Sequence, residues 1–103
     1  MAHFIVTFRI ANEGNDQERY RSFVDAVVNL AGGSTGKVWD ETTSFYAFQA
    51  DYPNADSVAA KLNLDSKFDT TQDIMVVIDV ANQNKATRGP LKYATLLTSY
   101  LGF

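Results

Sequence analysis

The chain has 103 residues, 46% of them hydrophobic, and a formal net charge of −3. This length and composition predict one globular domain spanning residues 1–103, with a single core, and exclude a disordered segment. Because the balance of charge is acidic, nucleic-acid binding is expected to be weak or absent. The lack of cysteine excludes disulfides and thiolate metal sites.

The apolar segments are too short for a membrane protein. None approaches the roughly 20 residues that a spanning helix needs. Arg9 also interrupts the first apolar run, where a signal peptide would have to remain apolar. We therefore expect a cytoplasmic protein without membrane association.

The first third of the chain predicts a strand followed by a helix. Residues 3–11 alternate between apolar and more polar positions, as in a strand. Asn15 and Glu18 have the spacing of a capping box, so a helix should begin there. Gly32 and Gly33 should end it before a loop that runs to Lys37. The helix face expected to contact a sheet contains Tyr20, Phe23, Val24, Val27, Val28 and Ala31.

The middle of the chain predicts a hairpin and a second helix. Residues 37–42 and 45–50 are rich in aromatic and β-branched residues and flank a short polar turn, which is typical of two antiparallel strands. After Pro53 and Asn54, apolar residues return at helical spacing over 55–62. Residues 67–73 lack periodicity and predict a loop.

The last third predicts a strand, a linker and a terminal helix. Residues 74–81 are the most β-prone segment of the chain, whereas 82–89 are polar and predict a linker. Pro90 suits a first helical position. One face of the expected helix carries Leu91, Ala94, Leu97 and Leu101.

The predicted order of elements is β-α-β-β-α-β with a C-terminal helical extension over about 82–103. This order indicates an α+β, ferredoxin-like fold, in which two helices cover one face of a four-stranded antiparallel sheet. The strand order would be 4-1-3-2. Residues 74–81 would then form an edge strand, and a long apolar edge is usually covered or paired with another chain.

Few residues indicate catalysis. His3 is the only histidine and has no metal-ligand spacing around it. Asp40 and Asp79 are the candidate catalytic acids, although turn formation and cross-strand pairing explain them better. Aromatic residues crowd the hairpin, where we favour packing in the core or an interface over base stacking: Trp39, Phe45, Tyr46 and Phe48.

Four segments together resemble a known family. They are HFIVTFRI, YRSFVDAVVNL, WDETTSFYAF and DIMVVIDVAN, within residues 3–82. The pattern resembles the bacterial SinR-type proteins, which group with the VapD toxins and the small CRISPR-associated endoribonuclease. The resemblance implies a ferredoxin-like homodimer with a metal-dependent phosphodiesterase site, built from first-strand acids that face each other across the two-fold axis.

The chain departs from this family at its catalytic position. The family's aromatic-Asp-aliphatic motif corresponds to Phe8-Arg9-Ile10, and its hairpin Asp corresponds to Asp40. Arginine cannot ligate Mg²⁺, and its charge would repel the ion. The resemblance therefore implies a scaffold that has lost the catalytic carboxylate.

The leading hypothesis is a non-catalytic homodimeric domain that binds a protein partner or assembles with itself, without a cofactor or bound metal. Its candidate binding residues are Arg9, Asn12 and Trp39. Its candidate dimer interface consists of Ile74, Val76, Ile78 and Val80. Two alternatives remain open: a Mg²⁺-dependent endonuclease that uses other carboxylates, and a dimeric α+β protein that binds a small ligand in an aromatic pocket.

Overall fold

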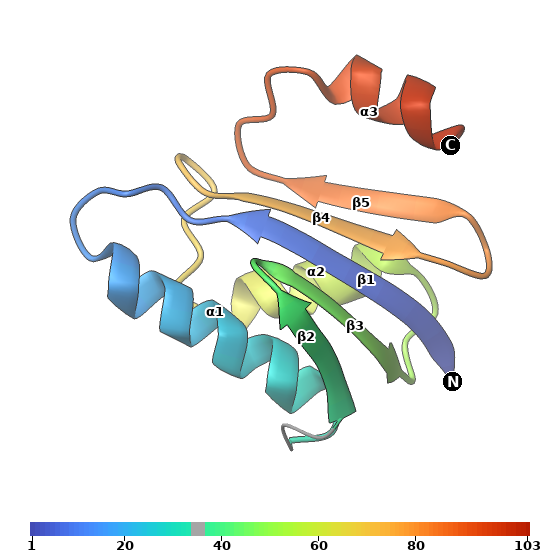
Figure 1. The fold of residues 1–103 in the computed structure, drawn as a ribbon, viewed down its shortest axis with the longest axis horizontal. Helices are drawn as coiled ribbons and strands as arrows, with labels where there is room; N and C mark the ends of the chain where they lie inside the picture. Colours follow the sequence, from blue (N-terminus) through green and yellow to red (C-terminus); the bar gives the residue numbers. More distant parts are fainter. Residues whose placement is uncertain (34–36) are drawn as a thin grey trace.

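The computed structural model describes residues 1–33 and 37–103 and shows an α+β fold (Figure 1). Within these residues, five strands and three helices follow one another in the order β1, α1, β2, β3, α2, β4, β5, α3. Their bounds are β1 Ala2–Arg9, α1 Asp16–Leu30, β2 Val38–Thr42, β3 Phe45–Ala50, α2 Ala55–Leu64, β4 Ile74–Asp79, β5 Asn84–Arg88 and α3 Ala94–Leu101.

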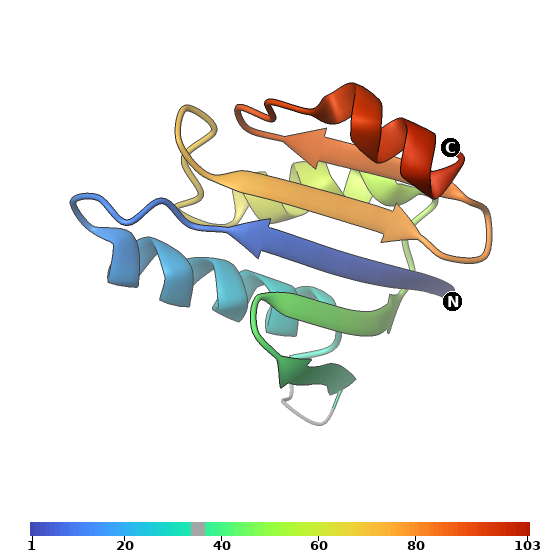
Figure 2. The same ribbon diagram turned by 45° about the horizontal axis from the view of Figure 1, so that its top comes forward.

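The strands form one antiparallel sheet in the order β2-β3-β1-β4-β5. Helices α1 and α2 lie on one face of this sheet, whereas α3 lies on the opposite side, over β4 and β5 (Figure 2). The first four strands are neighbours in the order β4-β1-β3-β2, and β5 extends the sheet beyond β4. The predicted hairpin is confirmed, with Ser44 at a φ of 56° in its turn.

The prediction of a polar linker at 82–89 is wrong, because most of this segment forms β5. This strand pairs with β4 from Met75↔Arg88 to Asp79↔Asn84. The predicted edge position of residues 74–81 is therefore also wrong, since β4 lies between β1 and β5. β5 escapes prediction because it is an edge strand in which only Ala86 is buried, too little for a period-two pattern.

The core lies between the sheet and helices α1 and α2. Alternate residues of β1, Phe4, Val6 and Phe8, point into it and are almost fully buried. The ring centroids of Phe8 and Phe23 lie 4.6 Å apart, so α1 packs directly on the centre of the sheet. The other large members of the core include Val27, Phe48, Val58, Leu62, Met75 and Val77.

The start of α1 differs from the prediction. Asn15 is the N-cap, but its side chain makes no capping hydrogen bond and instead accepts one from Arg19. Glu18 forms an ion pair with Lys67 rather than reaching back to the cap. The capping box lies at α2, where Asn54 and Ser57 exchange hydrogen bonds.

The buried face of α1 is also rotated from the predicted one. It contains Phe23, Ala26 and Val27 together with the charged residue Arg19, whereas Tyr20 is partly exposed. Gly32 and Gly33 end the helix as predicted, with positive φ angles of 122° and 81°. Residues 34–36 of the predicted loop lie outside the described residues.

The terminal helix begins at Ala94 rather than at the predicted Pro90. It ends at Gly102, which adopts the left-handed conformation with a φ of 88°. None of its residues is buried, and Tyr93 and Tyr100 beside and within it are largely exposed. Among the helices of the described residues, none combines the length and apolar character needed to cross a membrane.

Candidate functional site

The sheet face that α1 and α2 leave uncovered is here called the open face, and it carries apolar side chains from β1, β2, β3 and β4. The strand register aligns its side chains in rows across the sheet. One row runs Trp39, Ala47, Ile5, Ile78 and Lys85, and the next runs Thr42, Phe45, Thr7, Val76 and Thr87. Trp39 is 44% exposed, and its ring meets Phe45 edge-on at 5.8 Å. Of the residues in these two rows only Lys85, at the β5 edge, is charged.

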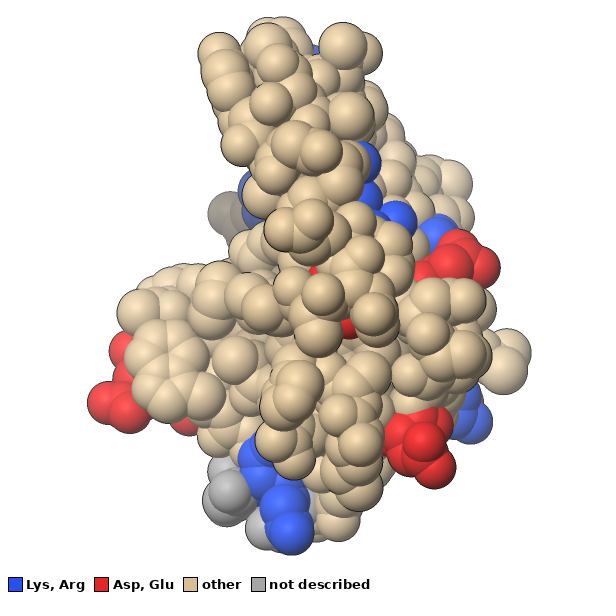
Figure 3. Space-filling view, turned by 90° about the vertical axis from the view of Figure 1, so that its right-hand side faces the viewer, with Lys and Arg blue, Asp and Glu red and all other residues tan. Residues whose placement is uncertain are grey.

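Helix α3 covers only part of the open face. In the space-filling view it stands out from the body as a lobe with few charged atoms (Figure 3). A hydrogen bond of 2.6 Å from Lys85 Nζ to the backbone oxygen of Phe103 ties its end to the sheet. Leu96 and Tyr100 remain exposed on the helix. The apolar surface thus continues from the sheet onto α3.

A groove separates the beginning of α3 from the sheet beneath it. Its volume is about 550 Å³. Arg9, Ile74 and Val76 of β1 and β4 form one wall. The opposite wall consists of Leu97 of α3 and of the segment that leads into the helix: Pro90, Leu91, Lys92 and Tyr93.

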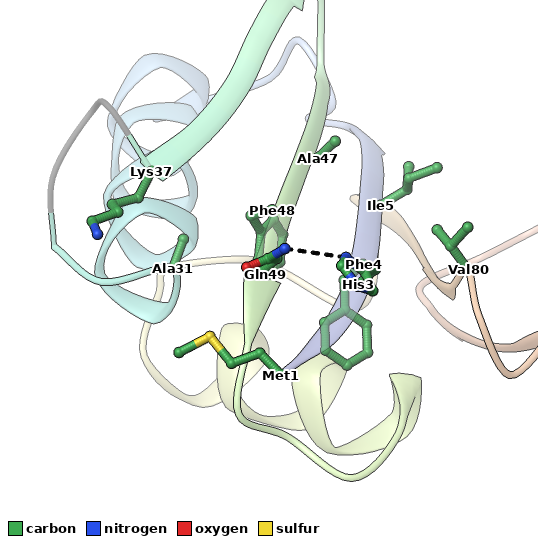
Figure 4. A pocket seen from close by; sticks show the side chains of 10 residues that line it. All are labelled: Met1, His3, Phe4, Ile5, Ala31, Lys37, Ala47, Phe48, Gln49 and Val80. Carbon is green, nitrogen blue, oxygen red and sulfur yellow. Dashed lines mark hydrogen bonds between the residues drawn. The ribbon is translucent and has the colours of Figure 1, made fainter.

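At the opposite end of the open face, a second hollow lies beside the start of β1 (Figure 4). Ile5 and Val80 line one side of it, and Val80 is 49% exposed. Gln49 Nε2 lies 3.5 Å from His3 Nδ1, which links β3 to β1. The hollow includes the sole histidine, whose ring lies near the Gln49 amide, and Lys37 also lines it.

Asp79, one of the two candidate catalytic acids, is fully buried at the end of β4. Its carboxylate accepts hydrogen bonds from the backbone and side-chain amides of Asn82 and from the side chain of Asn84. The side-chain hydrogen bond from Asn82 is the main cause that lowers the pKa of Asp79. Asp79 therefore holds the β4–β5 turn, and nothing in the structure brings it near Asp40.

Asp40, the other candidate, is exposed at a bulge in β2. The pairs Trp39↔Ala47 and Thr42↔Phe45 leave Asp40 and Glu41 opposite Tyr46 alone. Burial raises the pKa of the Tyr46 hydroxyl, and the nearby charges of Tyr20 and Asp40 add to the shift. The bulge thus brings Asp40 close to the tyrosines rather than to Arg9.

The three candidate binding residues do not form one site. Arg9 lies at the end of β1 on the open face, opposite Ile74. Trp39 lies on the same face but two strands away, on β2. Asn12 is exposed in the loop between β1 and α1. The candidate interface residues Ile74, Val76 and Ile78 belong to the open face, and Val80 continues the same alternation.

Sequence reasoning missed a buried ion pair between Arg19 and Asp73. Arg19 Nε lies 3.0 Å from Asp73 Oδ2, and the two residues are 3% and 0% exposed. The guanidinium also donates to the backbone oxygens of Ala11 and Glu13. The pair therefore fixes the β1–α1 loop against the loop before β4. No local pattern marks it, because its partners are 54 residues apart.

Comparison of the chain with protein-family models, with curated proteins and with solved structures finds no match. Within the described residues, no group of three or more histidine and acidic side chains is placed to hold a metal ion.

Proposed function

We propose that this chain is a non-catalytic assembly domain that forms a homodimer through its open face. The scaffold would be a ferredoxin-like sheet with an added edge strand, related to that of the small CRISPR-associated endoribonuclease and the VapD toxins. The observation that carries the proposal is an apolar row across the sheet that runs from Trp39 at the β2 edge through Ala47 and Ile5 to Ile78, with a charge only at its β5 end, Lys85.

The exposure of side chains on the open face favours a partner. A continuous apolar surface of this kind commonly marks a protein interface. On the helix-covered face, residues of the same strands are buried beneath α1 and α2, whereas on the open face Trp39 and Val80 remain about half exposed. A second sheet packed on the open face would bury both.

The distribution of charge favours a second copy of the chain as that partner. In a two-fold interface the same patch meets itself, so a patch with charges of one sign at its centre would repel its copy. Here the basic residues Arg9 and Lys85 lie toward the ends of the open face, and its middle is uncharged. Contact would be made by side chains of β4, such as Ile78. The backbone of β4 would not take part, because it is already hydrogen-bonded to β1 and β5.

Light scattering tests the proposal. At ~100 μM, well above micromolar dissociation constants, the intact chain should have twice its 11.4 kDa mass. Ile78→Asp and the more exposed Val80→Asp should yield the monomer mass. Leu64→Asp makes the same change at a residue that is 79% exposed on α2, and it should leave the dimer intact. A monomeric mass for the unaltered chain would refute the proposal.

We also propose that the chain does not hydrolyse nucleic acids. Arg9 occupies the position of the family's catalytic acid, and hydrogen bonds engage the carboxylate of Asp79 in its own hairpin. Purified protein incubated with labelled RNA and DNA and Mg²⁺ or Mn²⁺ should therefore leave both intact. Cleavage that is lost with EDTA and in Asp40→Ala would support the nuclease alternative instead.

A further inference from the structure

We infer that the groove between α3 and the sheet binds an anionic molecule with an apolar tail, of the alkyl carboxylate class. This inference goes beyond the proposed function and does not depend on it, because one copy of the chain supplies every residue that lines the groove. It develops the alternative of a small-ligand-binding protein and gives Arg9 a role.

The walls of the groove suit an alkyl chain. Ile74 and Val76 form the floor, and Leu91 and Leu97 face them from the segment around α3. The volume of about 550 Å³ lies within the range of roughly 300 to 1,000 Å³ that is usual for small-molecule sites. A buried tail would gain the usual benefit of removing apolar surface from water.

The charged residues of the groove determine the head group. Arg9 and Lys92 are exposed and line the groove, and no aspartate or glutamate lines it with them. Neither takes part in an ion pair within the described residues, where the four ion pairs use other basic side chains. Two uncompensated cations in a chain of net charge −3 favour an anion. An arginine is well suited to a carboxylate, which it can bind with two parallel hydrogen bonds.

The anchoring of α3 allows the groove to adjust to a ligand. The helix has no buried residue, and one hydrogen bond from Lys85 ties its end to β5. A tail between Leu97 and the sheet would add contacts in the first half of the helix. Binding should therefore immobilise α3 as well as fill the groove.

Methyl-labelled NMR with decanoate at pH 7 tests the inference. Decanoate below its micelle concentration should shift the methyl signals of Ile74, Val76 and Leu97. It should leave those of Val27 and Leu62 in the helix-covered core unchanged. Decanol should bind more weakly, and decylammonium should bind most weakly, because Arg9 and Lys92 repel it. No shift at millimolar decanoate, or equal binding of decylammonium, would overturn the inference.

Charge-removing variants sharpen the test. Arg9→Gln with Lys92→Gln should raise the Kd for decanoate roughly four- to twenty-five-fold, two- to fivefold for each exposed cation. The Kd for decanol should change less than twofold. Arg21→Gln removes an exposed charge on α1 and should have no effect on either ligand. An equal loss of decanoate affinity in Arg21→Gln would contradict the assignment of the head-group site.

The same samples separate the two proposals. Light scattering with and without decanoate reports the mass, and the methyl shifts report the groove. A monomer that binds decanoate would refute only the assembly function, and a dimer that fails to bind it would refute only the groove ligand.

Discussion

The two faces of the sheet differ in what covers them, although they are built from the same strands. On the helix-covered face, Phe4, Val6 and Phe8 of β1 pack against two helices and are almost fully buried. On the open face, Ile5 and Thr7 of the same strand lie between their partners on β3 and β4, and the helix on this side, α3, has no buried residue. The first face accounts for stability, whereas the second has apolar surface available for binding.

The ion pair of Arg19 and Asp73 should give the largest effect on stability. Arg19→Met should lower the free energy of unfolding by about 3 to 5 kcal/mol, because it leaves the carboxylate of Asp73 buried without its cation. Arg88→Met removes the partner of the exposed Asp56 and should cost about 1 kcal/mol or less. Urea unfolding measures both, and similar losses would contradict this ranking.

Gly89 should be the next most sensitive position. Its φ is 101°, and a Cβ there would lie 1.9 Å from the backbone oxygen of Asp73. Gly89→Ala should therefore cost about 3 kcal/mol or more, from both strain and overlap. Gly14 has a φ of 59° with open space around it, so Gly14→Ala should cost only about 1 to 2 kcal/mol. Thermal unfolding distinguishes the two, and equal losses would show that Gly89 does not approach Asp73.

Asp79→Asn should have a smaller effect that depends on pH. Near pH 7 it should cost about 1 to 3 kcal/mol, because an amide cannot accept all the hydrogen bonds from Asn82 and Asn84. Folding lowers the pKa of Asp79, so the native carboxylate stabilises the fold above the unfolded pKa of about 3.9. That contribution is lost as the pH falls through the lower, folded pKa.

Unfolding free energies of both chains between pH 2 and 7 test this dependence. The difference between the unaltered chain and Asp79→Asn should be constant above about pH 5 and should shrink below about pH 4. Asp25→Asn makes the same charge change at an exposed position on α1 and should show a much smaller difference. A difference that grows in acid would mean that folding raises the pKa of Asp79.

The smallest effect on stability is expected on the open face. Val80→Asp and Leu64→Asp both alter exposed side chains, so each should change the unfolding free energy of the monomer by less than about 0.5 kcal/mol. Denaturation at submicromolar concentration measures this. A large loss in Val80→Asp alone would mean that Val80 supports the fold itself.

Most of the fold could be predicted from the sequence, because the elements that pack against the core have strong periodicity. The strand at β1 and the stripe around Phe23 and Val27 are such elements. β5 could not be predicted, because only Ala86 of its five residues is buried. An edge strand needs few apolar residues. The pairing of β5 with β4 depends on the tertiary fold and leaves no local sequence pattern.

The candidate site was less predictable than the fold. The chemistry of Arg9 marks it as a candidate in the sequence, but its place in a groove depends on where the tertiary fold puts the segment from Pro90 to Tyr93. Asp73 looked like an ordinary loop residue, because Arg19 approaches it only through the tertiary fold. Long-range partners of this kind leave no local pattern.

The most direct test of the open face as an interface between copies is an isotope-filtered NMR experiment. A mixture of labelled and unlabelled chains at ~100 μM, well above micromolar dissociation constants, reports only contacts between copies. We expect intermolecular signals at Ile5, Ile78, Val80 and Trp39, and none at Leu64 or Val58 on the helix side. Signals from the helix side, or no intermolecular signals at all, would contradict the account.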